Sequence, residues 1–196
     1  MRLTPWLATV ALCALAGCAQ MVKVDSGQVT VKEALQLTTA SAWNRFELRF
    51  PLSVAPGASE VWTQEGITLD ALAFFVGVAQ GETLGRAIGR KKLPDFRGTM
   101  TPGEIVELYE QMVTQDGSAF ALQRVAPGRF GGQPGFRFEH TIIRKSDSVL
   151  LKGVAHGAVV KDKLYLVAFT APAIHYYDRY APQVESMLAS SRIRAP

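Results

Sequence analysis

The chain has 196 residues, of which 48% are hydrophobic and 19% charged, with a formal net charge of +4. This length is sufficient for one domain with a full hydrophobic core. The positive excess is too small to indicate a nucleic-acid-binding protein, although it is compatible with a position beside anionic lipid. No apolar stretch reaches the ~20 residues that a membrane-spanning helix needs.

The N-terminus has the pattern of a secretory signal peptide. Arg2 supplies positive charge, and residues 7–16 form an apolar run about half as long as the ~20 residues of a membrane-spanning helix. The run ends in Leu15-Ala16-Gly17-Cys18, which resembles the lipobox of bacterial lipoproteins. In that family the cysteine receives a diacylglyceryl group and the chain is cut just before it. We therefore expect residues 1–17 to be a cleaved signal peptide and Cys18 to be lipidated.

The expected lipid fixes the location of the protein. Each buried methylene contributes ~0.8 kcal/mol, so two or three acyl chains hold a protein on a membrane. Ala19 stands where an aspartate would resemble the inner-membrane retention signal. We therefore expect a periplasm-facing outer-membrane lipoprotein, with the inner membrane as the alternative. Cys13 leaves with the signal peptide and Cys18 is consumed by lipid, so no thiol remains for a disulfide, a thiolate catalyst or zinc.

The mature chain is predicted to begin with a short lipidated tether over 18–27 and to continue as a single domain over 28–196. Its first part is mainly extended. Residues 60–63 and 67–72 flank a glycine-containing turn and predict a β-hairpin. Residues 73–78 continue the second strand as a nearly unbroken apolar run, which is typical of a central strand covered on both faces.

Residues 81–98 form a basic, glycine-containing loop. Its cations are a candidate surface for lipid headgroups, lipopolysaccharide or an acidic partner, with an ordinary solvated loop as the alternative. They are Arg86, Arg90, Lys91, Lys92 and Arg97. The chain contains neither G-x-G-x-x-G near this loop nor G-K-[ST] anywhere, so a nucleotide site is not supported.

A helix is predicted to begin after Thr101. Thr101 can cap it, Pro102 occupies its first position, and Glu104 completes a capping box. Apolar residues then recur at helical spacing, which predicts an amphipathic helix that covers a sheet and ends near Asp116-Gly117. The stripe comprises Ile105, Leu108, Tyr109 and Met112.

From Ala119 onward the pattern changes to strands, expected over 120–125, 136–142, 149–160 and 164–169, with turns at Pro127-Gly128, 131–135 and 161–163. Gly153, Ala155 and Gly157 share one face of the third strand. These small residues either let a helix pack closely or admit a ligand.

A C-terminal helix follows, with an apolar face of Val184, Met187 and Leu188. Tyr176, Tyr177 and Tyr180 are expected either as core residues or as a binding surface.

The strand Leu164–Pro172, an aromatic turn, a helix and a final Ser190-x-x-Ile193 follow one another at the C-terminus. With Gly132, Gly135 and Gly153 upstream, this order resembles the PsbP-like family over residues 101–193. The resemblance implies an α+β fold in which helices sandwich an antiparallel sheet, and we expect this sheet to have five to seven strands. It also implies a non-enzymatic role, because the named members bind proteins such as a photosystem subunit or a small GTPase. No functional residue can be carried over.

The sequence shows no active site. His140, His156 and His175 are the candidates for acid–base chemistry at neutral pH, yet no metal-binding or hydrolase motif surrounds them. We therefore expect no catalytic residue, metal or cofactor. The leading hypothesis is a non-enzymatic binding or scaffolding module for an envelope protein partner. The alternative is a carrier or sensor of a small apolar or lipidic ligand, and a more remote one is a hydrolase that uses a histidine. His140 and His156 are on neighbouring predicted strands, where they could approach each other.

Overall fold

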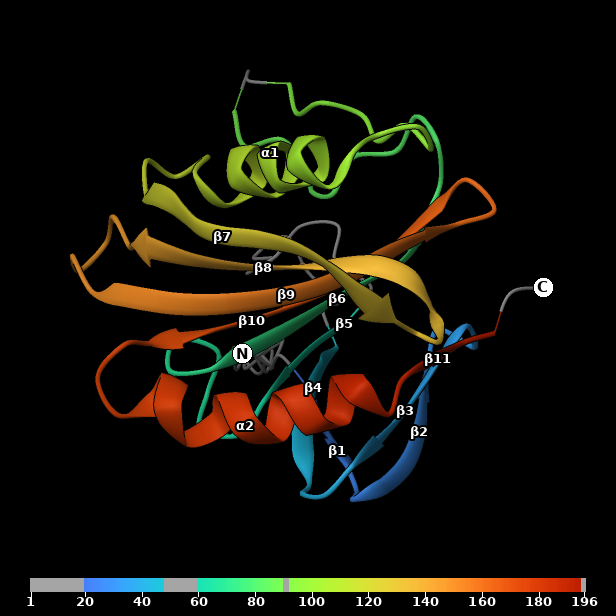
Figure 1. The fold of residues 1–196 in the computed structure, drawn as a ribbon. Coiled ribbons are helices and arrows are strands. Elements are labelled where there is room, and N and C mark those ends of the chain that lie inside the picture. Colours follow the sequence, from blue (N-terminus) through green and yellow to red (C-terminus); the bar gives the residue numbers. More distant parts are fainter. Residues whose placement is uncertain (1–19, 48–59, 90–91, 195–196) are drawn as a thin grey trace, which may run out of the picture.

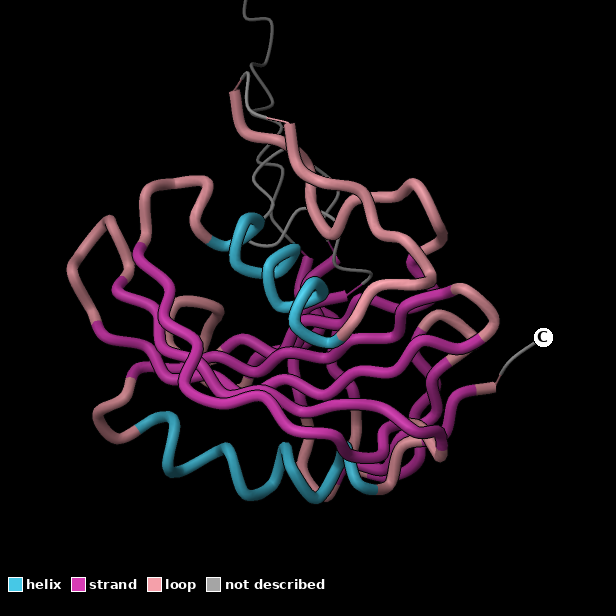
Figure 2. Tube along the Cα trace, turned by 45° about the horizontal axis from the view of Figure 1, so that its top comes forward, coloured by secondary structure: helices cyan, strands magenta, loops and turns pink. Residues whose placement is uncertain are grey.

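The computed structural model describes residues 20–47, 60–89 and 92–194. A large sheet forms the middle layer, with helix α1 on one face and helix α2 on the other (Figures 1 and 2). The predicted signal peptide and Cys18 lie outside the described residues, so both stay predictions. Within the described part of the chain, neither helix is long and apolar enough to cross a bilayer.

The elements follow the chain in a simple order. The first six strands are β1 (Gln20–Val24), β2 (Gly27–Val31), β3 (Leu35–Thr39), β4 (Trp43–Glu47), β5 (Glu60–Thr63) and β6 (Ala71–Val78). The second half comprises α1 (Pro102–Val113), β7 (Ala119–Phe130), β8 (Gln133–Ile143), β9 (Leu150–Val160), β10 (Lys163–Pro172), α2 (Tyr176–Ala189) and β11 (Arg192–Ile193).

Within the described residues, the main sheet has eight strands in the order β1-β4-β5-β6-β10-β9-β8-β7, and every neighbouring pair is antiparallel. A second sheet, β11-β3-β2, has three strands and ties the C-terminus to the N-terminal region. The predicted α+β fold class, a sheet sandwiched by helices, is confirmed. The main sheet is larger than the five to seven strands that the sequence pattern suggests.

Two hydrophobic cores lie on opposite faces of the main sheet. Because strand side chains alternate, β10 serves both cores. Leu164, Leu166 and Ala168 face α1, whereas Tyr165, Val167 and Phe169 face α2. On β6, Phe75 joins the α1 core and Phe74 the α2 core, and both are fully buried. The unbroken apolar run over 73–78 therefore does mark a central strand.

Helix α1 begins as its sequence predicts. The Thr101 hydroxyl accepts from the backbone N–H of Glu104, while the Glu104 carboxylate accepts from the backbone N–H of Thr101 at 2.7 Å. These two bonds satisfy backbone donors that would otherwise have no partner in the helix. The apolar stripe Ile105, Leu108, Tyr109 and Met112 is buried against the sheet. The capping box therefore fixes where the covering helix starts.

Three stretches differ from expectation. Residues 67–70, expected at the start of a strand, form a turn before β6. Residues 20–24, expected in a tether, form edge strand β1, which pairs with β4 from Gln20↔Glu47 to Val24↔Trp43. Pro127, expected in a turn, lies inside β7, where the edge position tolerates a residue without an N–H. The turn itself lies at Gly131 and Gly132, whose φ angles are +62° and +81°. Glycine adopts such angles without a steric penalty.

Candidate functional site

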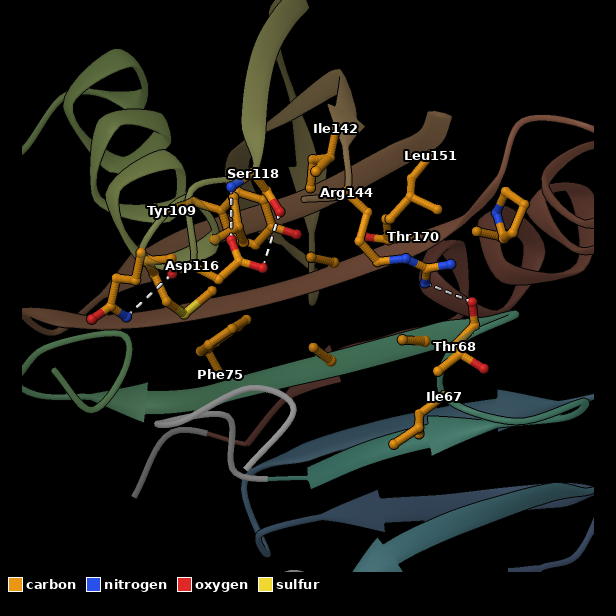
Figure 3. A pocket seen from close by; sticks show the side chains of 18 of the residues that line it. Ile67, Thr68, Phe75, Tyr109, Asp116, Ser118, Ile142, Arg144, Leu151 and Thr170 are labelled. Atoms are coloured by element: carbon orange, nitrogen blue, oxygen red, sulfur yellow. Dashed lines mark hydrogen bonds between the residues drawn. The ribbon is translucent and has the colours of Figure 1, made fainter. Parts of the chain in front are cut away.

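A pocket of about 380 Å³ lies between α1 and the sheet, near the C-terminal end of the helix (Figure 3). We call it the α1 pocket. Tyr109, Met112 and Val113 of α1 form one wall. The floor comes from four strands, with Ala71 and Ala73 of β6, Ile142 of β8, Leu151 of β9 and Ala168 of β10. Its volume is in the range of pockets that bind small molecules in proteins.

Small side chains on the sheet create this space. Ala71, Ala73 and Ala168 occupy the α1 face where the pocket lies. Farther along the same strands, Phe75 and Leu166 project from that face and fill the gap beneath the helix. Because an alanine methyl is short, the helix and the sheet stay apart at the alanine positions. The pocket is therefore a product of the sheet sequence.

Polar groups at the mouth are paired with one another. The Arg144 guanidinium donates to the Asp147 carboxylate at 2.7–3.1 Å and to the carbonyl oxygen of Thr68 at 2.8 Å (Figure 3). The hydrogen bonds from Arg144 lower the pKa of Asp147. Asp116 accepts from the N–H and the hydroxyl of Ser118 at 2.8 and 3.0 Å. At the mouth, the charge of Arg144 is therefore balanced by Asp147, and the Asp116 carboxylate is hydrogen-bonded to Ser118.

The interior of the α1 pocket is uncharged. Burial raises the pKa of Tyr109 to about 12, and its hydroxyl lies in hydrogen-bonding contact with Thr170, so the phenol stays protonated. Among the described residues, His140 and Gln183 carry buried side-chain polar atoms without a hydrogen-bond partner, and neither residue lines the pocket. Such a site suits a molecule that is mainly apolar and carries no charge.

The sheet separates the two histidines that the sequence places on neighbouring strands. His140 opposes Gly153 on the α1 face, whereas His156 opposes Arg137 on the α2 face. The expectation that they might meet is therefore wrong, and they cannot act as a pair. His175 is exposed just before α2. None of the three lines the α1 pocket.

His156 belongs to an ion-pair network that fastens α2 to the sheet. Its Nε2 lies 2.8 Å from Oε2 of Glu185, and Arg137 donates to Oε1 of Glu185 at 2.7 and 3.0 Å and also to Glu139. The hydrogen bond from His156, together with Arg137, lowers the pKa of Glu185 to about 2. Every charged group here has a partner, which indicates a structural role. The described residues contain no cluster of His, Cys, Asp and Glu arranged to hold a metal.

The small residues on β9 do not open a ligand site. A Cβ at Gly153 would overlap the His140 ring, and a Cβ at Gly157 would lie 2.6 Å from Cζ of Phe136. Ala155 is fully buried opposite Phe138. Aromatic rings of β8 therefore fill the space above these residues. The space for a ligand lies over Ala71, Ala73 and Ala168. The sequence analysis did not identify these three residues. The signal that could have indicated them is the presence of alanines within predicted strands that are otherwise rich in larger apolar residues.

The basic loop contributes to a wall of the α1 pocket. Ile88 of this loop lines the pocket, and its N–H donates to Gln115 at 2.8 Å. Buried side chains of Leu84, Leu93 and Phe96 hold the loop against α1 and the sheet. The loop is thus part of the folded domain.

Three of the five candidate cations fall within the described residues. Arg86, Lys92 and Arg97 are all exposed, and Arg97 lies 3.5 Å from the carboxylate of Glu104. Arg90 and Lys91 lie outside the described residues. The predicted lipid- or partner-binding role of these five cations stays a prediction.

Comparison with known proteins identifies the fold. No known family profile and no curated protein sequence matches the chain. Among solved structures, the solution structure of cyanobacterial PsbP (CyanoP) from Synechocystis sp. PCC 6803 is similar, with a TM-score of 0.58 and 14% identity. The match covers 95% of this chain and 100% of that one. The fold is therefore PsbP-like, as the sequence pattern predicts.

Proposed function

We propose that this protein binds a small, mainly apolar and uncharged molecule in the α1 pocket, as a carrier or sensor. The observation that carries the proposal is the pocket itself, a space of about 380 Å³ with alanines on its floor and with its charged residues, Arg144 and Asp116, at the mouth. A domain that needed only a stable core would fill this space with larger side chains, as the same strands do at Phe75 and Leu166. The paired polar groups at the mouth leave burial of apolar surface as the driving force.

A protein-binding role, the leading hypothesis from the sequence, is the second candidate, and one surface favours it. Leu122 and Val125 of edge strand β7 are 44% and 42% exposed. They pair with His140 and Phe138, so they lie on the α1 face beyond the cover of the helix. Exposed apolar side chains on an edge strand are typical of a contact surface for another protein.

Filling the α1 pocket should abolish ligand binding without loss of stability. We expect an apolar compound to co-purify with the wild type and to be absent from Ala73→Leu, because the added side chain occupies the floor. Filling a cavity changes stability little or adds about 0.5–2 kcal/mol. The measurement is mass spectrometry of solvent extracts from protein purified out of its own cell envelopes. Ala121→Leu, at an exposed position of β7, is the matched control.

For this experiment, retention of the compound by Ala121→Leu and its loss from Ala73→Leu support the proposal. Equal amounts of the compound in both variants, or none in the wild type, contradict it.

We further propose that the domain is tethered to the outer membrane through lipid on Cys18. The lipobox-like residues 15–18 support this proposal. Metabolic labelling with palmitate and membrane fractionation should show that Cys18→Ala loses both the label and the membrane association. Cys13→Ala, which changes the other cysteine, should keep both. Membrane association of Cys18→Ala at the wild-type level would overturn the anchor.

A further inference from the structure

A buried histidine with unused hydrogen-bonding capacity lies next to the α1 pocket. His140 is 1% exposed, and neither Nδ1 nor Nε2 has a hydrogen-bond partner among the described residues. Native proteins pair nearly all of their buried polar groups, and an exception calls for an explanation in terms of function or solvent. The ion-pair network of His156 offers none, because it lies on the other face of the sheet.

The surroundings of His140 are built for its ring. The imidazole stacks on Phe120 at 5.1 Å and meets Tyr109 and Phe138 at centroid distances of 5.2 and 5.5 Å. Gly153 lies opposite, and any side chain there would overlap the ring. An apolar side chain would pack equally well against these rings, so packing alone does not explain a histidine.

Tyr109 stands between this histidine and the α1 pocket. Its ring lines the pocket and also contacts His140. The next cross-strand pair on the same face of the sheet is Ile142 and Leu151, two residues along from His140 and Gly153. Both Ile142 and Leu151 line the pocket. The Tyr109 ring is therefore the side chain that separates the pocket from the imidazole.

We propose that His140 forms the polar end of the α1 pocket and hydrogen-bonds the uncharged end group of an otherwise apolar ligand when the Tyr109 ring moves aside. This inference rests on the proposed function. A neutral imidazole offers one donor and one acceptor, which matches a hydroxyl group. A carboxylate would need a protonated ring, which apolar surroundings disfavour. The ligand class is therefore a long-chain alcohol or a similar neutral molecule.

The test compares two probes with the same ten-carbon body, 1-decanol and n-decane. Their affinities are measured by displacement of the neutral fluorophore 1-aminoanthracene from the wild type and from His140→Leu. One net hydrogen bond changes an affinity by about 3- to 10-fold. We therefore expect the preference for decanol over decane to fall by about that factor in the variant, while the affinity for decane stays the same.

Nitrogen-15 NMR of the histidine rings gives a readout on the wild type that does not depend on the variant. The ring resonances of His140 should shift with 1-decanol and stay in place with n-decane. Equal preference in the two proteins, or a His140 ring that ignores bound decanol, overturns the role of His140 and leaves the apolar pocket standing. Absence of binding by both probes overturns the proposed function as well.

Discussion

Acidification from pH 7 to pH 4.5 is expected to lower the free energy of unfolding by about 2–3 kcal/mol through His140 alone. Burial lowers the pKa of His140 from 6.5 to about 3. Below pH 6.5, His140 is therefore protonated in the unfolded chain, whereas in the folded protein it stays neutral down to about pH 3. The contribution of the neutral ring is complete above pH 6.5 and is lost as the pH falls toward 3. Urea denaturation at a series of pH values measures it.

His140→Leu supplies the control for this pH dependence. The variant should lose the slope between pH 7 and 4.5, and at pH 7 it should be at least as stable as the wild type, because it no longer buries an unpaired polar ring. The stabilisation from Glu185, whose pKa is lowered to about 2, is lost mainly between pH 4.5 and pH 2. All other titratable groups are common to both proteins, so the difference between their slopes over the window from 7 to 4.5 reports His140. An unchanged slope in the variant would show that His140 is not the group that titrates.

Gly135→Ala should destabilise the protein by about 1–3 kcal/mol. A Cβ at this position of β8 would overlap the carbonyl oxygen of Gly157 and would lie 3.2 Å from Cβ of Ala158. Backbone atoms of β9 cannot yield as a flexible side chain can, so strands β8 and β9 would have to separate there. The shift in the urea midpoint measures the loss.

Gly128→Ala is the matched control, because Gly128 is the cross-strand neighbour of Gly135 on β7. A Cβ there would meet nothing within 4 Å. Its stability should stay within about 0.5 kcal/mol of the wild type. Equal losses in the two variants would mean that glycine is needed in this hairpin for its backbone freedom and not for the close approach of β9.

Local signals in the sequence were sufficient where short-range chemistry decides the structure. The capping box at Thr101 and Glu104 fixed the start of α1, and the alternating pattern over 136–142 and the apolar run over 164–169 predicted β8 and β10. Such features depend on hydrogen bonds and side-chain periodicity within one element. Errors arose where a distant strand supplies the partner. Residues 20–24 carry a weak strand pattern and form β1 because their backbone pairs with the edge of β4.

The α1 pocket could not be predicted because it depends on contacts between distant elements. Ala73 and Ala168 are far apart in the sequence and become cross-strand neighbours only when β6 pairs with β10. Gly153 and Gly157 suggested open space, yet the rings of His140 and Phe136 fill it because β8 pairs with β9 in this register. Residue size alone does not tell where a cavity forms. The residues on the facing strand and helix decide whether the space above a small residue is filled.

The most direct test of the account is to locate a bound apolar probe by NMR. Nuclear Overhauser effects between n-decane and the protein methyl groups would identify the residues in contact with it. We predict contacts with the methyl groups of Ala73, Ala168 and Leu151, which line the α1 pocket. Contacts confined to Leu122 and Val125 on β7, or no contacts at all, would contradict a ligand-binding role for the pocket.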